Sequence, residues 1–194
     1  MYDNIINSIE NSILVKNLIL RSHETLNNLN NVMHLAVGTY QKGNKILICG
    51  NGGSAADAQH IACELVGKFY LDRESLPVIS LTNNTSVITA IGNDYGFDEL
   101  FARQIKAFGN TGDMFLGLTT SGNSKNIINA VEICKNKGIT TVVLTGASGG
   151  RVKELCDHCI CIPSNDTPRV QESHLMIGHI LSAIIEKEIF TKEK

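Results

Sequence analysis

The chain has 194 residues, 43% of them hydrophobic, and a formal net charge of −2 at pH 7. This length suits one domain with a full core, and the charge argues against a broad nucleic-acid or anionic-membrane footprint. The first residues lack the features of a secretory signal, and no stretch reaches the roughly 20 apolar residues of a membrane span. We therefore expect a cytoplasmic protein that binds neither nucleic acid nor membrane.

The first 42 residues predict helix before any strand begins. Apolar side chains recur at helical spacing over 2–37, as one long helix or as two that break near Arg21–Thr25. A helix of this length ahead of the first strand more often packs on a partner subunit than stands alone. We expect it to contribute to subunit contact.

Residues 43–194 predict a core in which strands and helices alternate. Short apolar runs without alternation, typical of strands buried on both faces, span 45–49, 77–81, 114–118, 140–144 and 159–162. Helical patterns cover 54–68, 85–91, 97–108, 124–137, 150–156 and about 170–188. The order predicts a single α/β domain over 1–194, a three-layer αβα, doubly wound, mainly parallel five-stranded sheet with an N-terminal helical extension.

The six cysteines do not predict a disulfide framework or a zinc knuckle. Cys156 and Cys159 have the spacing of half a knuckle, but no second ligand pair follows at a suitable distance. Buried free thiols are the favoured interpretation.

A glycine-rich loop, GNGGS at 50–54, follows the first predicted strand and opens a helix. Gly50, Gly52 and Ala55 match the dinucleotide spacing G-x-G-x-x-A. The second strand, however, ends in Thr82-Asn83-Asn84 and lacks the carboxylate that holds a nucleotide ribose. A sugar phosphate is therefore favoured over a nucleotide.

A second polar loop, TTSGNS at 119–124, follows the third predicted strand. Its four hydroxyls and the N-terminus of the next helix suit a phosphomonoester, which has several acceptor oxygens. A helix cap with a polar turn is the simpler alternative, because serine and asparagine are common there. The density of hydroxyls favours phosphate binding.

Ionisable side chains on two helices extend this pattern. Asp57, His60 and Glu64 share one helix face, and the pair His60 and Glu64 could bind a metal, transfer protons or simply face solvent. On the last helix, Gln171 and His179 lie at the two ends of an apolar stripe. Taken singly, His179 is more often a core histidine than a ligand.

Two neighbours on that helix, Glu172 and His174, lie off the stripe and are predicted to face solvent.

Taken together, these stretches resemble the sugar isomerase (SIS) domain, and more narrowly the phosphoheptose isomerases. The matching stretches keep family order over essentially the whole chain: CGNGGSAADAQHIACEL, AIGNDYGF, TTSGNS, LTGASGG and RVQESHLMIGHI. The resemblance implies an aldose–ketose isomerase that converts D-sedoheptulose 7-phosphate to D-glycero-D-manno-heptose 7-phosphate through an enediol(ate). This is the first step of ADP- or GDP-heptose biosynthesis, which supplies lipopolysaccharide, capsule or another glycan.

The resemblance also implies a site. One zinc ion per subunit is expected at His60, Glu64, Gln171 and His179, with Glu64 as the catalytic base and His179 as its proton-shuttling partner. The implied substrate contacts are Asn51, Gly52, Gly53, Ser54, Glu64, Asn93, Asp94, Thr119, Thr120, Ser121, Ser124 and Gln171. Asp166 is a further candidate for a sugar hydroxyl, and Lys68 stands where the family commonly has arginine.

Family members are homotetramers with active sites between subunits, so we expect the same assembly here. Three alternatives remain. A different SIS isomerase should lack the pair Gln171 and His179. A non-catalytic SIS protein that binds a sugar phosphate or a replication-initiator protein should lose the catalytic residues. A nucleotide oxidoreductase should carry the missing ribose carboxylate.

Overall fold

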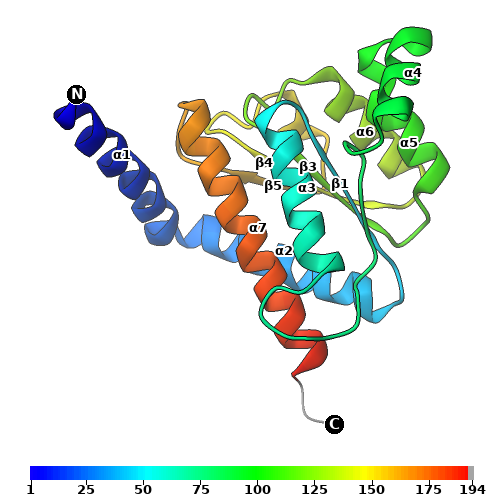
Figure 1. The fold of residues 1–194 in the computed structure, drawn as a ribbon, viewed down its shortest axis with the longest axis horizontal. Helices are drawn as coiled ribbons and strands as arrows, with labels where there is room; N and C mark the ends of the chain where they lie inside the picture. Colours follow the sequence, from blue (N-terminus) through cyan, green and yellow to red (C-terminus); the bar gives the residue numbers. More distant parts are fainter. Residues whose placement is uncertain (192–194) are drawn as a thin grey trace.

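The computed structural model describes residues 1–191, and within them five strands form one parallel sheet in the order β2-β1-β3-β4-β5 (Figure 1). The strands are β1 Ile46–Gly50, β2 Val78–Ser80, β3 Met114–Thr119, β4 Thr140–Thr145 and β5 His158–Cys161. β1, β3 and β4 are buried almost throughout, which explains why their sequences are continuous apolar runs. The predicted α/β class and parallel sheet are confirmed.

Helices cover both faces of this sheet. One face carries α2 His23–Gln41, α3 Gly53–Val66 and α7 Thr167–Phe190, and the other carries α4 Thr85–Tyr95, α5 Leu100–Phe108 and α6 Lys125–Asn136. Two 3-10 turns, η1 Phe97–Glu99 and η2 Arg151–Glu154, lie in the connections. The α-helix predicted over 150–156 is thus wrong in kind, since this short connection to β5 holds only the 3-10 turn.

The N-terminal helical pattern breaks at Ser22, where one of the two predicted alternatives places the break. α1 Tyr2–Arg21 ends there, and the Ser22 hydroxyl caps α2 by accepting from the backbone N–H of Thr25 at 3.1 Å. α1 extends away from the sheet and contacts α2 and α7 (Figure 1). Its exposed apolar side chains are Tyr2, Ile5, Ile6, Ile9, Ile13, Leu14, Leu18 and Leu20.

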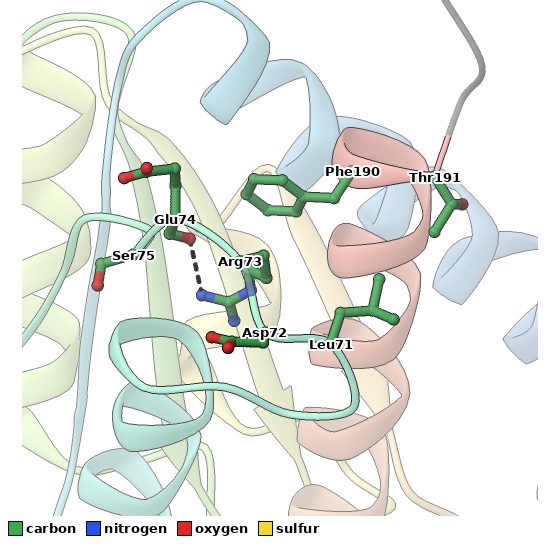
Figure 2. A pocket seen from close by; sticks show the side chains of 7 residues that line it. All are labelled: Leu71, Asp72, Arg73, Glu74, Ser75, Phe190 and Thr191. Atoms are coloured by element: carbon green, nitrogen blue, oxygen red, sulfur yellow. Dashed lines mark hydrogen bonds between the residues drawn. The ribbon is translucent and has the colours of Figure 1, made fainter.

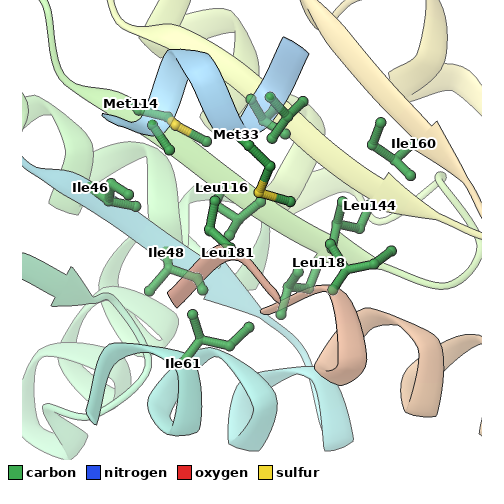
Figure 3. Packing of buried hydrophobic residues seen from close by; sticks show 14 of the residues in the cluster. Met33, Ile46, Ile48, Ile61, Met114, Leu116, Leu118, Leu144, Ile160 and Leu181 are labelled. Carbon is green, nitrogen blue, oxygen red and sulfur yellow. The ribbon is translucent and has the colours of Figure 1, made fainter. Parts of the chain in front are cut away.

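The core beneath α3 and α7 determines how closely these two helices approach. Figure 3 shows Ile61 of α3 and Leu181 of α7 packed against Ile48 and Leu116 of the sheet. Gly178 of α7 lies against Ile61, so that a Cβ at this position would overlap the Ile61 side chain. The absence of a side chain at Gly178 therefore permits the close packing of α3 and α7.

The cysteines differ in burial. Cys49 and Cys134 are buried, Cys156, Cys159 and Cys161 are partly buried, and Cys63 is exposed. The prediction of buried thiols is wrong for Cys63, because α3 turns this side chain away from the core. Among residues 1–191, no helix is long and apolar enough to cross a bilayer.

Candidate active site

Three ionisable side chains from α3 and α7 form one cluster, which we call the His–Glu–His cluster: His60, Glu64 and His179. The Nε2 atoms of His60 and His179 lie 2.9 Å apart, and His60 Nε2 lies 3.2 Å from Glu64 Oε1. The side chain of Glu64 is 19% exposed and that of His60 is 45% exposed. A small ligand can therefore reach the cluster from solvent.

The cluster suits a divalent metal. Its three possible ligand atoms all lie within 4.8 Å of one another. Two imidazoles and a carboxylate are the donor set of many catalytic zinc sites, which keep a fourth position open for water or substrate. The residues thus fit zinc. The structure supports a possible metal site at three of the four predicted ligands.

The fourth predicted ligand, Gln171, lies elsewhere in the same chain. It packs against the start of α3, where a Cβ on Gly53 would come within 2.7 Å of Gln171 Nε2. Gln171 and His179 stand eight positions apart on α7, which is about 12 Å along a helix axis. Within one protomer the structure therefore groups Gln171 with the glycine-rich loop.

An aromatic ring closes one side of the cluster. The Phe69 ring stacks on the His179 ring with centroids 5.7 Å apart, and the His60 ring meets His179 edge-on at 5.1 Å. Phe69 lies in the segment that follows α3, and nothing in its local sequence pattern marks it as a site residue. This neighbour was missed by the sequence analysis.

Asp57 lies one turn before His60 on α3. Its Oδ2 atom is buried and has no hydrogen-bond partner among the described residues, and burial raises the pKa of this carboxyl group. Asp57 does not belong to the His–Glu–His cluster.

The prediction that His174 faces solvent is wrong. Its side chain is fully buried, and its Nε2 lies 3.3 Å from the carbonyl oxygen of Thr145 at the end of β4. Burial lowers the pKa of His174 to about 4, so this histidine is neutral at pH 7. The error arises because α7 packs on α3 with one side and on the sheet with another. Its neighbour Glu172 is partly exposed and pairs with Arg169 at 2.9 Å.

The two predicted phosphate loops meet where the strand order reverses, between β1 and β3. Asn51 of the first loop and Asn126 of α6 exchange two amide hydrogen bonds, at 3.0 and 2.9 Å. Asn126 is 2% exposed and was also missed from sequence. The Asn51 side chain is thereby paired within the protein, and its carbonyl oxygen accepts from the backbone N–H of Ser54 at 3.0 Å.

The first loop presents the start of α3 to this edge of the sheet. Gly52 precedes α3 with φ of +57°, and as a glycine it has no side chain to cap the first turn of the helix. Ser54 follows in that turn and is buried. Gly53 leaves room for Gln171, as described above. The N–H groups of Ser54 and Ala55 already donate to the carbonyl oxygens of Asn51 and Gly52, so the N–H groups of Gly52 and Gly53 are the ones that this helix end can offer to an anion.

The second loop is braced by the loop after β4. Gly122 has φ of +66°, and a Cβ there would overlap the carbonyl oxygen of Gly149. Backbone hydrogen bonds run from Gly146 N to Thr120 O and from Val152 N to Gly122 O, both at 3.0 Å. This contact fixes the backbone of 119–124, which carries the four hydroxyls.

The hydroxyls of this loop are partly paired with one another. Thr119 Oγ1 and Ser124 Oγ lie 3.2 Å apart, and Ser121 Oγ accepts from the backbone N–H of Asn123 at 3.1 Å. Ser124 precedes α6 without a capping bond from its side chain, so the hydroxyl is not used as an ordinary helix cap. The loop retains both hydroxyl groups and a helix N-terminus for an anion.

Asn93 and Asp94 lie outside these groups. Both are exposed on α4, which packs on α5 against the other face of the sheet, and Asn93 Nδ2 donates to Asp94 Oδ1 at 2.8 Å. The structure of one chain therefore brings together three separate sets: the His–Glu–His cluster, the two loops with Gln171, and the Asn93–Asp94 pair.

Known proteins share this fold and a large part of this sequence. The family model for the SIS domain matches residues 14–146. A phosphoheptose isomerase from Aneurinibacillus thermoaerophilus is 57% identical over 98% of this chain and 96% of its own length, and phosphoheptose isomerase 2 from Campylobacter jejuni is 55% identical over 93% and 90%. The structure of a phosphoheptose isomerase from Francisella tularensis superposes with a TM-score of 0.91 at 36% identity, over 96% of this chain and 98% of that one. This chain therefore belongs to the SIS domain family and, within it, to the phosphoheptose isomerases, which isomerise a sugar phosphate in heptose biosynthesis.

Proposed function

We propose that this isomerase converts D-sedoheptulose 7-phosphate to D-glycero-D-manno-heptose 7-phosphate. The observation that carries the proposal is the His–Glu–His cluster, which combines a carboxylate and two imidazoles within 4.8 Å. The reaction would open ADP- or GDP-heptose biosynthesis in the cytoplasm and supply a glycan such as lipopolysaccharide or capsule.

Aldose–ketose isomerisation moves a proton between C1 and C2 through an enediol(ate). In the proposed mechanism, the Glu64 carboxylate takes the proton from C1 of the ketose and returns it to C2. His179 moves the matching proton between the oxygens on C2 and C1. Both transfers require a proton acceptor or donor within hydrogen-bond reach of the substrate, which a carboxylate and an imidazole provide. The Phe69 ring stacks on His179 and so covers one side of the cluster.

The phosphate end of the sugar would bind the two loops. Hydroxyls of Ser54, Thr119, Ser121 and Ser124 and the backbone of Gly52 and Gly53 are the proposed phosphate contacts. A fixed phosphate aligns C1 and C2 with the base, and such alignment of the reacting groups raises the rate. Thr120, Asn93, Asp94 and Gln171 are proposed contacts to the sugar.

We further propose one zinc ion per subunit at His60, Glu64 and His179. When bound, zinc would polarise the substrate carbonyl as a Lewis acid. Gln171 remains the fourth candidate, but it can approach such an ion only from another subunit because of its 12 Å offset along α7, estimated from the helix rise.

The separation of the loops from the cluster supports a site built between subunits. Ser54 and Glu64 stand ten positions apart on α3, about 15 Å along the axis. In an extended seven-carbon sugar phosphate, C1 and the phosphorus atom are only about 10 Å apart, at ~3.5 Å for every three bonds. We therefore propose that a homotetramer combines the cluster of one subunit with the loops of another. The exposed apolar side of α1 is the natural surface for such assembly.

The direct test is incubation with sedoheptulose 7-phosphate followed by NMR of the sugar phosphates. The proposal expects the aldoheptose 7-phosphate to appear, with incorporation of solvent deuterium at C2 as the enediol(ate) exchanges its proton. Pentose and hexose phosphates serve as controls and should react at least tenfold more slowly. Turnover of a shorter sugar phosphate with no reaction of the heptulose would overturn the assignment.

A further inference from the structure

The segment that follows α3 is held in place by one buried carboxylate. Glu186 of α7 is 1% exposed and accepts backbone N–H groups from three consecutive residues: Phe69 at 3.2 Å, Tyr70 at 2.8 Å and Leu71 at 2.8 Å. Burial alone would raise the pKa of Glu186, but these bonds and Arg73 lower it, so the carboxylate stays ionised. A charged acceptor of three backbone donors defines the conformation of this segment.

Arg73 links the same carboxylate to the end of α3. Its Nε donates to Glu186 Oε2 at 3.1 Å, while its other nitrogens donate to the carbonyl oxygens of Glu64 at 2.9 Å and Leu65 at 2.8 Å. Figure 2 shows the guanidinium enclosed by its own segment and by Phe190, with a hydrogen bond to the Glu74 carbonyl at 3.0 Å. The Arg73 side chain is 3% exposed. One ion pair therefore joins α7, the segment after α3, and the last turn of α3.

The ion pair of Glu186 with Arg73 is linked to both residues with proposed proton-transfer roles, Glu64 and His179. Phe69, whose N–H is bound by Glu186, stacks its ring on His179 at 5.7 Å. The backbone of Glu64 is bound by Arg73. The contacts of the pair are with the backbone next to the Phe69 ring and with the turn that carries Glu64, and not with the ligand atoms of the cluster.

We propose that Glu186 and Arg73 are positioning residues for the isomerisation, which act by holding Phe69 against His179. The inference rests on the proposed roles of Glu64 and His179. It predicts that weakening the pair lowers kcat by misplacing the proton-transfer groups, while KM changes little because the phosphate loops lie elsewhere.

A purely structural role is the competing explanation, and a matched control separates the two. Asp113 is likewise 1% exposed and ion-paired, accepting from Lys45 Nζ at 2.6 Å, Lys45 N at 3.1 Å and Asn110 N at 2.8 Å. These residues precede β1 and β3 and belong to none of the three sets of site residues. Asp113→Asn removes a comparable buried charge without touching Phe69.

The variant Glu186→Gln is the matched perturbation. Its Oε1 can still accept from Tyr70 and Leu71, but an NH₂ group then faces the donors of Phe69 and Arg73. We expect kcat to fall at least tenfold with KM within threefold of wild type, whereas Asp113→Asn at a similar loss of thermal stability keeps kcat within twofold. Equal kcat values for the two variants would overturn the inference.

Two further measurements keep the result independent of folding and of the substrate assignment. In protein with ¹³C-labelled histidine, the Phe69 ring current shifts the His179 ring signal, and Glu186→Gln should move that signal toward its position in Phe69→Leu. In the double variant that combines Phe69→Leu with Glu186→Gln, kcat should be less than twofold below that of Phe69→Leu alone, because the effect of Glu186 passes through Phe69. An unmoved His179 signal or fully additive losses would refute the positioning role. Inactivity of the wild-type enzyme on sedoheptulose 7-phosphate would instead refute the proposed function. The NMR measurement needs no substrate, so it would still test whether Glu186 holds Phe69 against His179.

Discussion

Gly178→Ala is the most direct test of whether the approach of α3 and α7 controls activity. The added Cβ would overlap Ile61 Cδ1 and Cγ1, well inside the ~3.5 Å at which carbon atoms pack, so the helices must separate by about 1 Å. Ile61 is 1% exposed within the core, and its side chain has little room to move. Ile61 directly follows His60 and Gly178 directly precedes His179 in the sequence. The same displacement therefore opens the His–Glu–His cluster.

The energetic cost and the catalytic cost of this change should differ. Overpacking a core typically costs about 1–3 kcal/mol, and replacing helical glycine with alanine returns up to about 1 kcal/mol. After subtraction of that gain we expect a net loss of about 0–2 kcal/mol in urea unfolding. A misplacement of about 1 Å at reacting groups can cost on the order of 10²-fold in rate, so kcat should fall far more than stability suggests.

Gly38→Ala on α2 is the matched control, because a Cβ there meets no atom within 4 Å. It should leave kcat unchanged and stabilise the protein by up to about 1 kcal/mol. Activity of Gly178→Ala equal to that of Gly38→Ala would refute the dependence of the cluster on helix approach.

The remaining predictions address single groups of the site. Glu64→Gln and His179→Gln should each lower kcat by about 10²–10⁴-fold while calorimetry still detects sugar-phosphate binding; near-normal turnover would remove their roles. Asn126→Ala removes both hydrogen bonds of the partly buried Asn51 amide, at up to about 1–3 kcal/mol, and should raise KM at least tenfold with little change in kcat. For His174, the pKa is about 4 folded and 6.5 unfolded, so its stabilising contribution is full above pH 6.5 and falls by up to about 3 kcal/mol toward pH 4. Urea unfolding of His174→Gln at pH 7 and pH 5 should show a weaker pH dependence than wild type. Elemental analysis of protein prepared without chelator should find about one zinc per chain; its absence from a fully active enzyme would exclude the metal.

Local pattern was enough to determine much of this protein. β1, β3 and β4 read correctly as buried strands because a strand covered on both faces must be apolar throughout. His60 and Glu64 could be assigned to one helix face because the helical period is itself local. Strand–helix alternation then led to the parallel sheet, since parallel strands need crossover helices.

Tertiary contacts decided the rest, because they join residues that are far apart in the sequence. Asn51 meets Asn126 only after β1 and β3 pair, and Glu186 meets Phe69 only after α7 packs beside α3. The burial of His174 likewise depends on which side of α7 faces the sheet, which the apolar stripe in the helix sequence did not reveal. Sequence determined which chemical groups are present and which of them share a helix. The packing of α3 on α7 brought His60 to His179 and kept Gln171 with the loops.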